Sequence, residues 1–73
     1  SIRVSVYRTE AGAEVDFIIE KDGELFAIEL KASKTVRSSD LSGLRSFKDF
    51  YKKKHQGLII YLGDESFEID GVP

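Results

Sequence analysis

The dipeptide Asp22-Gly23 lies between two stretches in which apolar and polar residues alternate, and it constrains the fold more than any other feature. Both residues tolerate positive φ, so they favour a two-residue turn between antiparallel strands. Residues 14–20 and 24–31 are therefore predicted to form a β-hairpin. With these two residues in the turn, the numbers of directly paired residues sum to 45.

This register divides the hairpin into two faces of different chemistry. Directly paired residues share a face, with Cβ atoms roughly 4.5–5.5 Å apart. One face pairs Asp16 with Glu29 and Glu14 with Lys31. A shift of one residue would move charged side chains into the core, so the hydrophobic pattern supports the same register. The other face carries only apolar residues, which are Val15, Phe17, Ile19, Phe26, Ile28 and Leu30.

The remaining segments predict a small α/β domain with the element order βββαβ. Alternation predicts a first strand at residues 2–8, and the spacing of apolar residues predicts one main helix within residues 38–55. The apolar run at residues 58–62 is expected to form a strand buried on both faces. The helical segment is long enough to connect parallel strands, which makes the sheet mixed. A further edge strand is expected around residues 67–69.

Length and composition indicate one small domain covering residues 1–73. The chain has no cysteine that could form a disulfide or a thiolate zinc site. No apolar run is long enough to cross a bilayer and no signal-peptide pattern precedes the first strand, so a cytoplasmic location without membrane contact is expected. The start at Ser1, close to the first strand, suggests a piece of a larger protein.

Charge is unevenly distributed along the chain. The net charge is −2, but residues 31–55 contain eight basic and two acidic residues. Basic side chains of this segment could contact the phosphates of a nucleic acid. The alternative is a solvated helix flank, in which the last lysines complement the negative end of the helix dipole and Gly57 ends the helix. The predicted nucleic-acid-binding residues are Lys34, Arg37, Lys52, Lys53 and Lys54.

The polar face of the hairpin places two carboxylates, Asp16 and Glu29, directly opposite each other. Like charges in such a pair repel, so folding alone gives little reason for it. A divalent cation removes the objection, because Mg²⁺ is usually held by one or two carboxylates together with water and phosphate. Lys31 could stabilise charge that develops on a phosphate or position an attacking water. The alternative is an exposed strand face with a Glu14–Lys31 ion pair that contributes roughly 0–1 kcal/mol.

Three short sequences around the hairpin carry a resemblance to a known family. They are GAEVDFIIE, beginning at Gly12, the Asp22-Gly23 turn, and AIELKAS, beginning at Ala27. Together they resemble the core of the PD-(D/E)xK nuclease superfamily. More narrowly, the chain is similar to DUF4143, the C-terminal domain of bacterial and archaeal AAA-type ATPases, and the likeness extends through residues 40–44. The resemblance implies a restriction-endonuclease-like core, here without its first helix, and an ATPase module elsewhere in the parent chain.

The resemblance also implies roles for individual residues. Asp16, Glu29 and Lys31 would be the catalytic residues. Asp16 and Glu29 would bind the metal together with the backbone carbonyl of Leu30. Glu14 and Ser33 would be accessory residues. The implied cofactor is Mg²⁺ or Mn²⁺, and the implied reaction is hydrolysis of DNA phosphodiester bonds.

Two functions stay open on the sequence alone. The first is a divalent-metal-dependent nuclease-like domain, a Mg²⁺-dependent deoxyribonuclease, which the intact trio of Asp16, Glu29 and Lys31 favours. The second is a non-catalytic module that regulates an AAA-type ATPase or docks a partner. The short chain, the missing helix and the acidic balance favour this second function. A homodimer would cover apolar strand surface in either case.

Overall fold

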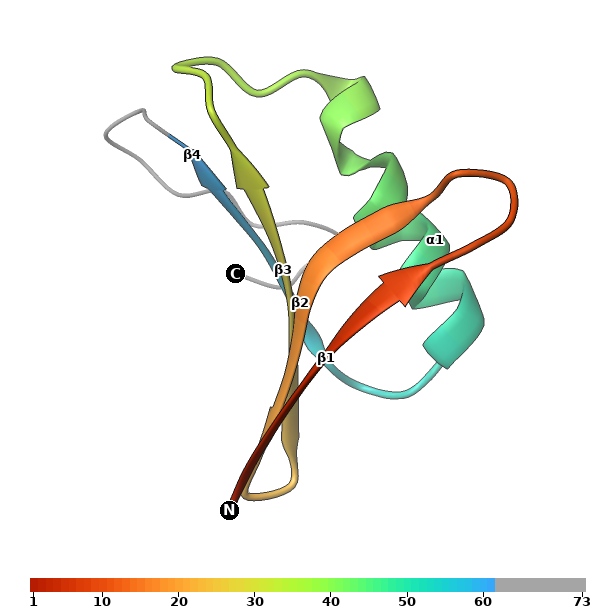
Figure 1. Ribbon diagram of the computed structural model, residues 1–73, viewed down its shortest axis with the longest axis vertical. Coiled ribbons are helices and arrows are strands. Elements are labelled where there is room, and N and C mark those ends of the chain that lie inside the picture. The colour runs from red at the N-terminus through yellow and green to blue at the C-terminus, as the bar shows by residue number, and fades with distance from the viewer. Residues whose placement is uncertain (62–73) are drawn as a thin grey trace.

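In the computed structural model, which describes residues 1–61, four strands form one sheet and a helix lies against it (Figure 1). The spatial order of the strands is β1-β2-β3-β4, with the first three antiparallel and β4 parallel to β3. The α/β class, the mixed sheet and the order βββαβ are thus confirmed, while the strand expected at residues 67–69 lies outside the described residues. The elements are β1 (Ile2–Arg8), β2 (Glu14–Lys21), β3 (Glu24–Lys31), the 3₁₀ helix η1 (Ser38–Leu41), α1 (Ser42–Tyr51) and β4 (Gln56–Tyr61).

The β2–β3 hairpin has the predicted turn and register. Asp22 and Gly23 have φ angles of 52° and 80°, the two positive values that a type I′ turn requires. The strands pair from this turn as far as Phe17↔Ile28, and the paired numbers sum to 45 as expected. Beyond that pair β2 bends away from β3 (Figure 1), so the predicted direct pairs Asp16↔Glu29 and Glu14↔Lys31 are not formed.

A β-bulge in β2 accompanies this bend. Between the pairs Ser5↔Ile18 and Tyr7↔Val15, one residue of β1 faces two residues of β2. A bulge changes the alternation of side chains between the two faces. Val15 and Ile18, three positions apart, consequently lie in the same core with exposed fractions of 1% and 7%. The prediction that Val15 shares a face with Phe17 is therefore wrong.

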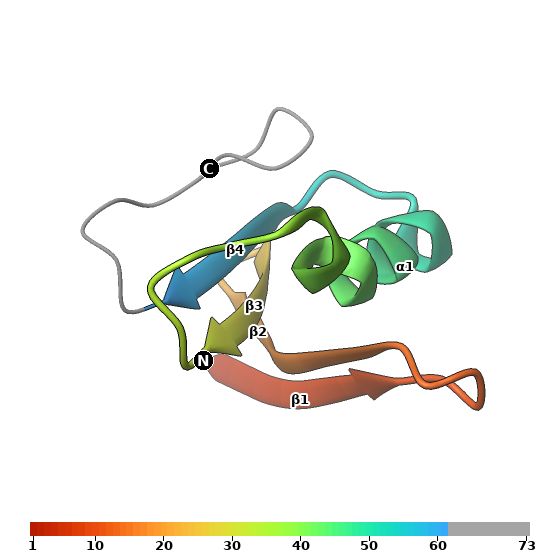
Figure 2. The ribbon, with the colours of Figure 1, turned by 90° about the horizontal axis from the view of Figure 1, so that it is seen from above.

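The helix α1 packs on the face of the sheet that carries Ala27 and Glu29, not on the wholly apolar face. Figure 2 shows α1 lying within the curve of the twisted sheet. Tyr7 of β1 joins this contact, since its hydroxyl lies 2.8 Å from Ser46 Oγ on α1. Within the described part of the chain, the opposite face of the sheet has no helix over it. The buried core beneath α1 consists of Val15, Ile18, Ala27, Leu44, Phe47 and Ile59.

The helix is shorter than the sequence suggested. α1 ends at Tyr51, and Lys52 takes the left-handed conformation with a φ of 62°. Gly57 is not the helix stop but a buried residue of β4, and His55 lies outside the helix. Neither helix within residues 1–61 has the length and apolar character needed to span a bilayer.

The strand β4 is buried on one face only. Ile59 beneath α1 is 2% exposed, whereas Ile60 on the opposite face is 53% exposed. The expected burial on both faces is therefore wrong for the described residues. Because β4 runs parallel to β3, Glu29 lies beside Ile59 and Lys31 beside Tyr61. The carboxyl ends of both strands thus reach the same edge of the sheet.

Candidate metal and phosphodiester site

A cleft of about 250 Å³ lies where the end of β3 meets the first turn of α1. Leu30 and the first residues of η1 and α1 form part of its wall. The charged side chains among its lining residues are Glu14, Glu29, Lys31 and Asp40. Three of them are acidic and one is basic, and three of the four were predicted as site residues. Asp40 was not among the predicted site residues.

Asp16 connects β2 and β3 at the point where they diverge. Its Oδ2 accepts a hydrogen bond from the backbone N–H of Leu30 at 2.9 Å. The Asp16 carboxylate replaces the backbone carbonyl that would otherwise accept this N–H, because the pairing of the two strands ends at Phe17↔Ile28. The N–H and C=O of a strand residue point toward the same edge, so the Leu30 carbonyl also faces the side of Asp16.

The carboxyl groups of Asp16 and Glu29 interact, and each shifts the pKa of the other. Burial raises the pKa of Glu29 to about 7, and the interaction with the Asp16 carboxylate adds to the rise. The interaction with Glu29 lowers the pKa of Asp16, and the Leu30 N–H lowers it further. Glu29 therefore binds a proton more tightly than Asp16 does.

Gly43 lets the first turn of α1 approach this pair. A Cβ at position 43 would overlap the backbone carbonyl oxygen of Glu14 and would lie 3.3 Å from Oε2 of Glu29. A glycine inside a helix costs about 1 kcal/mol relative to alanine, so a close contact is the reason for its place here. Sequence reasoning missed Gly43, although a glycine within a helical pattern is the signal that could have found it.

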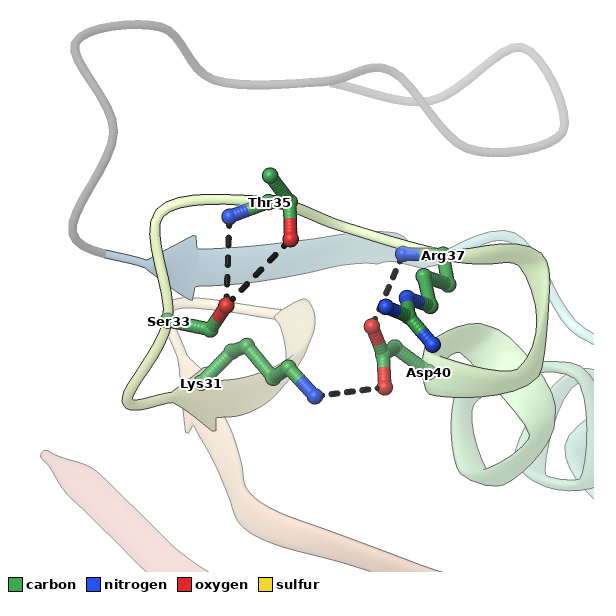
Figure 3. A network of polar contacts seen from close by, with 5 residues as sticks. All are labelled: Lys31, Ser33, Thr35, Arg37 and Asp40. Carbon is green, nitrogen blue, oxygen red and sulfur yellow. Dashed lines mark hydrogen bonds and ion pairs between the residues drawn. The ribbon is translucent and has the colours of Figure 1, made fainter.

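Lys31 pairs with Asp40 of η1, as Figure 3 shows. Its Nζ lies 2.8 Å from Oδ1 of Asp40, and the other oxygen, Oδ2, accepts the backbone N–H of Arg37 at 2.8 Å. The ammonium of Lys31 and this N–H lower the pKa of Asp40, so its carboxylate is charged at neutral pH. The alternative ion pair between Glu14 and Lys31 is therefore wrong. No sequence signal pointed to the Lys31–Asp40 pair.

Ser33 and the predicted phosphate-binding residues are not among the residues that line the cleft. Ser33 Oγ accepts the backbone N–H of Thr35 at 3.2 Å, so its hydroxyl stabilises the loop that follows β3 (Figure 3). Lys34 and Arg37 are exposed on the same loop, which leads to the cleft. The lysines at positions 52–54 follow the far end of α1, about 15 Å away for a ten-residue helix. The structure does not bring these three lysines to the cleft.

The acidic residues form a pair and not a larger cluster. Across residues 1–61, no three or more His, Cys, Asp or Glu side chains are grouped so that they could hold a metal ion.

A comparison with models of protein families matches residues 1–73 to DUF4143, described as a domain of unknown function. No curated protein and no solved structure matches the chain.

Proposed function

The chain belongs to the DUF4143 family, and we propose that it is a divalent-metal-dependent, nuclease-like domain that acts on DNA phosphodiester bonds. The observation that carries the proposal is the arrangement at the end of β3, where Glu29 lines a polar cleft and Asp16 of the adjoining strand β2 accepts the backbone N–H of Leu30. A restriction-endonuclease-like fold and membership of the PD-(D/E)xK superfamily are parts of the same proposal. The parallel β3–α1–β4 connection is compatible with both.

The residues of the site fit Mg²⁺ or Mn²⁺. These cations take oxygen ligands, and two carboxylates with water and phosphate are a sufficient protein contribution for Mg²⁺. Asp16 and Glu29 would supply the carboxylates, and the Leu30 carbonyl faces the same side. Glu29 must lose its proton to bind a cation, so cation binding would replace that proton. When bound, the cation would polarise the phosphodiester and make water more acidic.

Lys31, which lines the same cleft, would bind the phosphate. Its ammonium has three donors, and the contact with Asp40 uses one of them. The others can reach a phosphate oxygen and stabilise the negative charge that develops during hydrolysis. Lys34 and Arg37 on the adjoining loop would contact neighbouring phosphates. Glu14 lines the cleft as an accessory carboxylate, whereas Ser33 would act indirectly by holding the loop.

Cleavage of labelled linear and branched DNA tests this proposal. We expect cleavage in Mg²⁺ or Mn²⁺ and none in EDTA. Glu29→Gln and Lys31→Met should each reduce the rate by roughly 100-fold or more, as the loss of a charge-stabilising group does in other enzymes. Lys53→Met is the matched control and should leave the rate unchanged, because this lysine lies beyond the far end of α1. A native protein that cleaves neither DNA would contradict the nuclease activity.

A second candidate function is docking to the AAA-type ATPase module of a parent chain, without catalysis. The observation that favours it is the sheet face opposite α1, where Val4, Val6, Phe17, Leu30 and Ile60 are 41–58% exposed. Contiguous apolar surface of this kind often marks a protein–protein contact. Co-purification of the two modules should be lost in Val6→Lys and retained in Phe50→Lys, a control on the helix side. Retention in Val6→Lys would contradict docking through this face, and self-association of the native chain would indicate a homodimer instead.

A further inference from the structure

We infer that Asp40 is a positioning residue that holds the ammonium of Lys31 away from the carboxylates of Glu29 and Glu14. The inference rests on the proposed function, because it explains how one small cleft keeps a lysine and a pair of metal-binding carboxylates separate. Asp40 itself would touch neither the cation nor the phosphate.

The cleft brings the ammonium of Lys31 close to the carboxylates of Glu29 and Glu14. Without another partner, the ammonium would neutralise their charge. Glu29 and Lys31 are two positions apart on β3, so their side chains leave the same face of the sheet. Glu14 and Glu29 line the same cleft as Lys31, which is the basic residue among the described lining residues. A flexible ammonium in such a place pairs with the nearest unpaired carboxylate.

Asp40 prevents this pairing because a hydrogen bond to the backbone holds its carboxylate while the carboxylate binds the ammonium of Lys31. Its Oδ1 lies 2.8 Å from Lys31 Nζ, while its Oδ2 accepts the N–H of Arg37 at the start of η1. Figure 3 shows the carboxylate between these two partners. The side chain of Asp40 is 16% exposed and that of Lys31 is 33% exposed, so water screens their attraction only in part. The hydrogen bond to the backbone N–H of Arg37 holds the Asp40 carboxylate in place.

This arrangement keeps two chemical tasks apart. Glu29 stays available as a ligand for a metal cation, and the remaining donors of Lys31 stay available for a phosphate. A Lys31–Glu29 ion pair would prevent both cation binding by Glu29 and phosphate binding by Lys31. It would neutralise a metal ligand and place an ammonium where the metal cation should bind. Loss of Asp40 should therefore weaken cation binding even though Asp40 is not a ligand.

Carbodiimide crosslinking, which forms an amide between an amine and a carboxylate in direct contact, tests the inference without any metal. Mass spectrometry of peptides from the native protein should show a Lys31–Asp40 amide. In Asp40→Asn we expect amides from Lys31 to Glu29 or Glu14 instead. Asparagine is isosteric and can still accept the Arg37 N–H, so the fold should persist, which circular dichroism checks. Absence of both new amides would overturn the inference. Asp40→Glu is the conservative control and should retain an amide with Lys31.

Titration with Mn²⁺ adds a readout that a merely structural role of Asp40 would not produce. Asp40→Asn should weaken Mn²⁺ affinity roughly 10- to 100-fold, as the loss of an outer partner of a metal site does. In Asp40→Asn/Lys31→Met the affinity should return to that of Lys31→Met alone, because the competing ammonium is gone. An equal loss in both backgrounds would overturn the inference. A native protein that binds no Mn²⁺ would contradict the proposed function, and the crosslinks would still decide the role of Asp40.

Discussion

The Asp16 carboxylate accepts the backbone N–H of Leu30 at 2.9 Å, at the point where β2 leaves β3. The same carboxylate interacts with that of Glu29, which lowers the pKa of Asp16. Asp16 thus closes the end of the hairpin and also forms half of the proposed metal site. Because the first role needs only an acceptor oxygen and the second needs a negative charge, substitutions can separate them.

Asp16→Ala is expected to lower the free energy of unfolding by about 1–2 kcal/mol, because the Leu30 N–H loses its acceptor. Asp16→Asn keeps an acceptor oxygen and should lose less than half of that amount. Urea unfolding of both variants near pH 6, without metal, measures the difference. A gain of stability in Asp16→Ala would mean that repulsion between the carboxylates outweighs the hydrogen bond, contrary to this expectation.

Stability should decrease as the pH rises from about 4.5 to about 7. The fold raises the pKa of Glu29 from 4.5 to about 7, so the folded protein binds this proton more tightly than the unfolded chain. The resulting stabilisation is fully present below pH 4.5 and is lost as the pH rises through 7. Urea unfolding in EDTA across this range measures the slope.

Glu29→Gln is the control for this pH dependence, because glutamine does not titrate. Its stability should vary less with pH over the same window. Asp16 contributes with the opposite sign and at lower pH, since its pKa is lowered from 3.8 and its stabilisation is lost only as the pH falls through the folded value. An unchanged slope in Glu29→Gln would show that another group causes the dependence.

Gly43→Ala should destabilise the protein by roughly 1–3 kcal/mol, because the added methyl group overlaps the carbonyl oxygen of Glu14. The helical preference for alanine over glycine, about 1 kcal/mol, would act in the opposite direction. Thermal or urea unfolding gives the net effect. Asp49→Ala, at an exposed position of the same helix, serves as the control and should change stability by less than about 0.5 kcal/mol. Stabilisation by Gly43→Ala would contradict the close contact between α1 and β2.

Lys52→Gly should stabilise the protein by roughly 0.5–1 kcal/mol. Lys52 has a φ of 62°, a left-handed conformation that costs an L-residue with a side chain about 1 kcal/mol or more and costs glycine almost nothing. Lys53→Gly is the matched control. It removes the same charge and side chain at a position without a positive φ, and it should not stabilise. Equal effects of the two substitutions would exclude the conformational explanation.

The hairpin register could be predicted because two independent signals agree. The Asp22-Gly23 turn fixes which residues face each other, and the apolar alternation supports the same pairing. The register places Asp16 near Glu29, but their direct pairing is not formed because the ladder ends at Phe17↔Ile28. The unequal pKa values of these two carboxyl groups could not be predicted either, because they depend on burial beneath α1 and on the Leu30 N–H.

The face that α1 covers could not be predicted from alternation alone. The pattern separates Phe17 and Ile28 from Asp16 and Glu29 but does not say which set lies beneath the helix. Ala27 is the position where the helix fits closely, and its exposed fraction is 0%. The bulge that turns Val15 into the core depends on pairing with β1, which local sequence does not encode.

The residues that complete the site were missed for a similar reason. Asp40 meets Lys31 only because the loop after β3 returns toward the start of α1, and the path of a loop leaves no periodic signal. The helix end at Lys52 was also hidden, because Gly57 offered the more favourable residue for a left-handed stop.

Titration of Mg²⁺ into the native protein and into Glu29→Gln, followed by amide shifts in NMR spectra, tests the metal site most directly. The proposed site predicts saturable shifts centred on the amides of Asp16, Leu30 and Lys31 in the native protein and their loss in the variant. No shifts at millimolar Mg²⁺ in the native protein, or equal shifts in both proteins, would contradict a cation site at the Asp16–Glu29 pair.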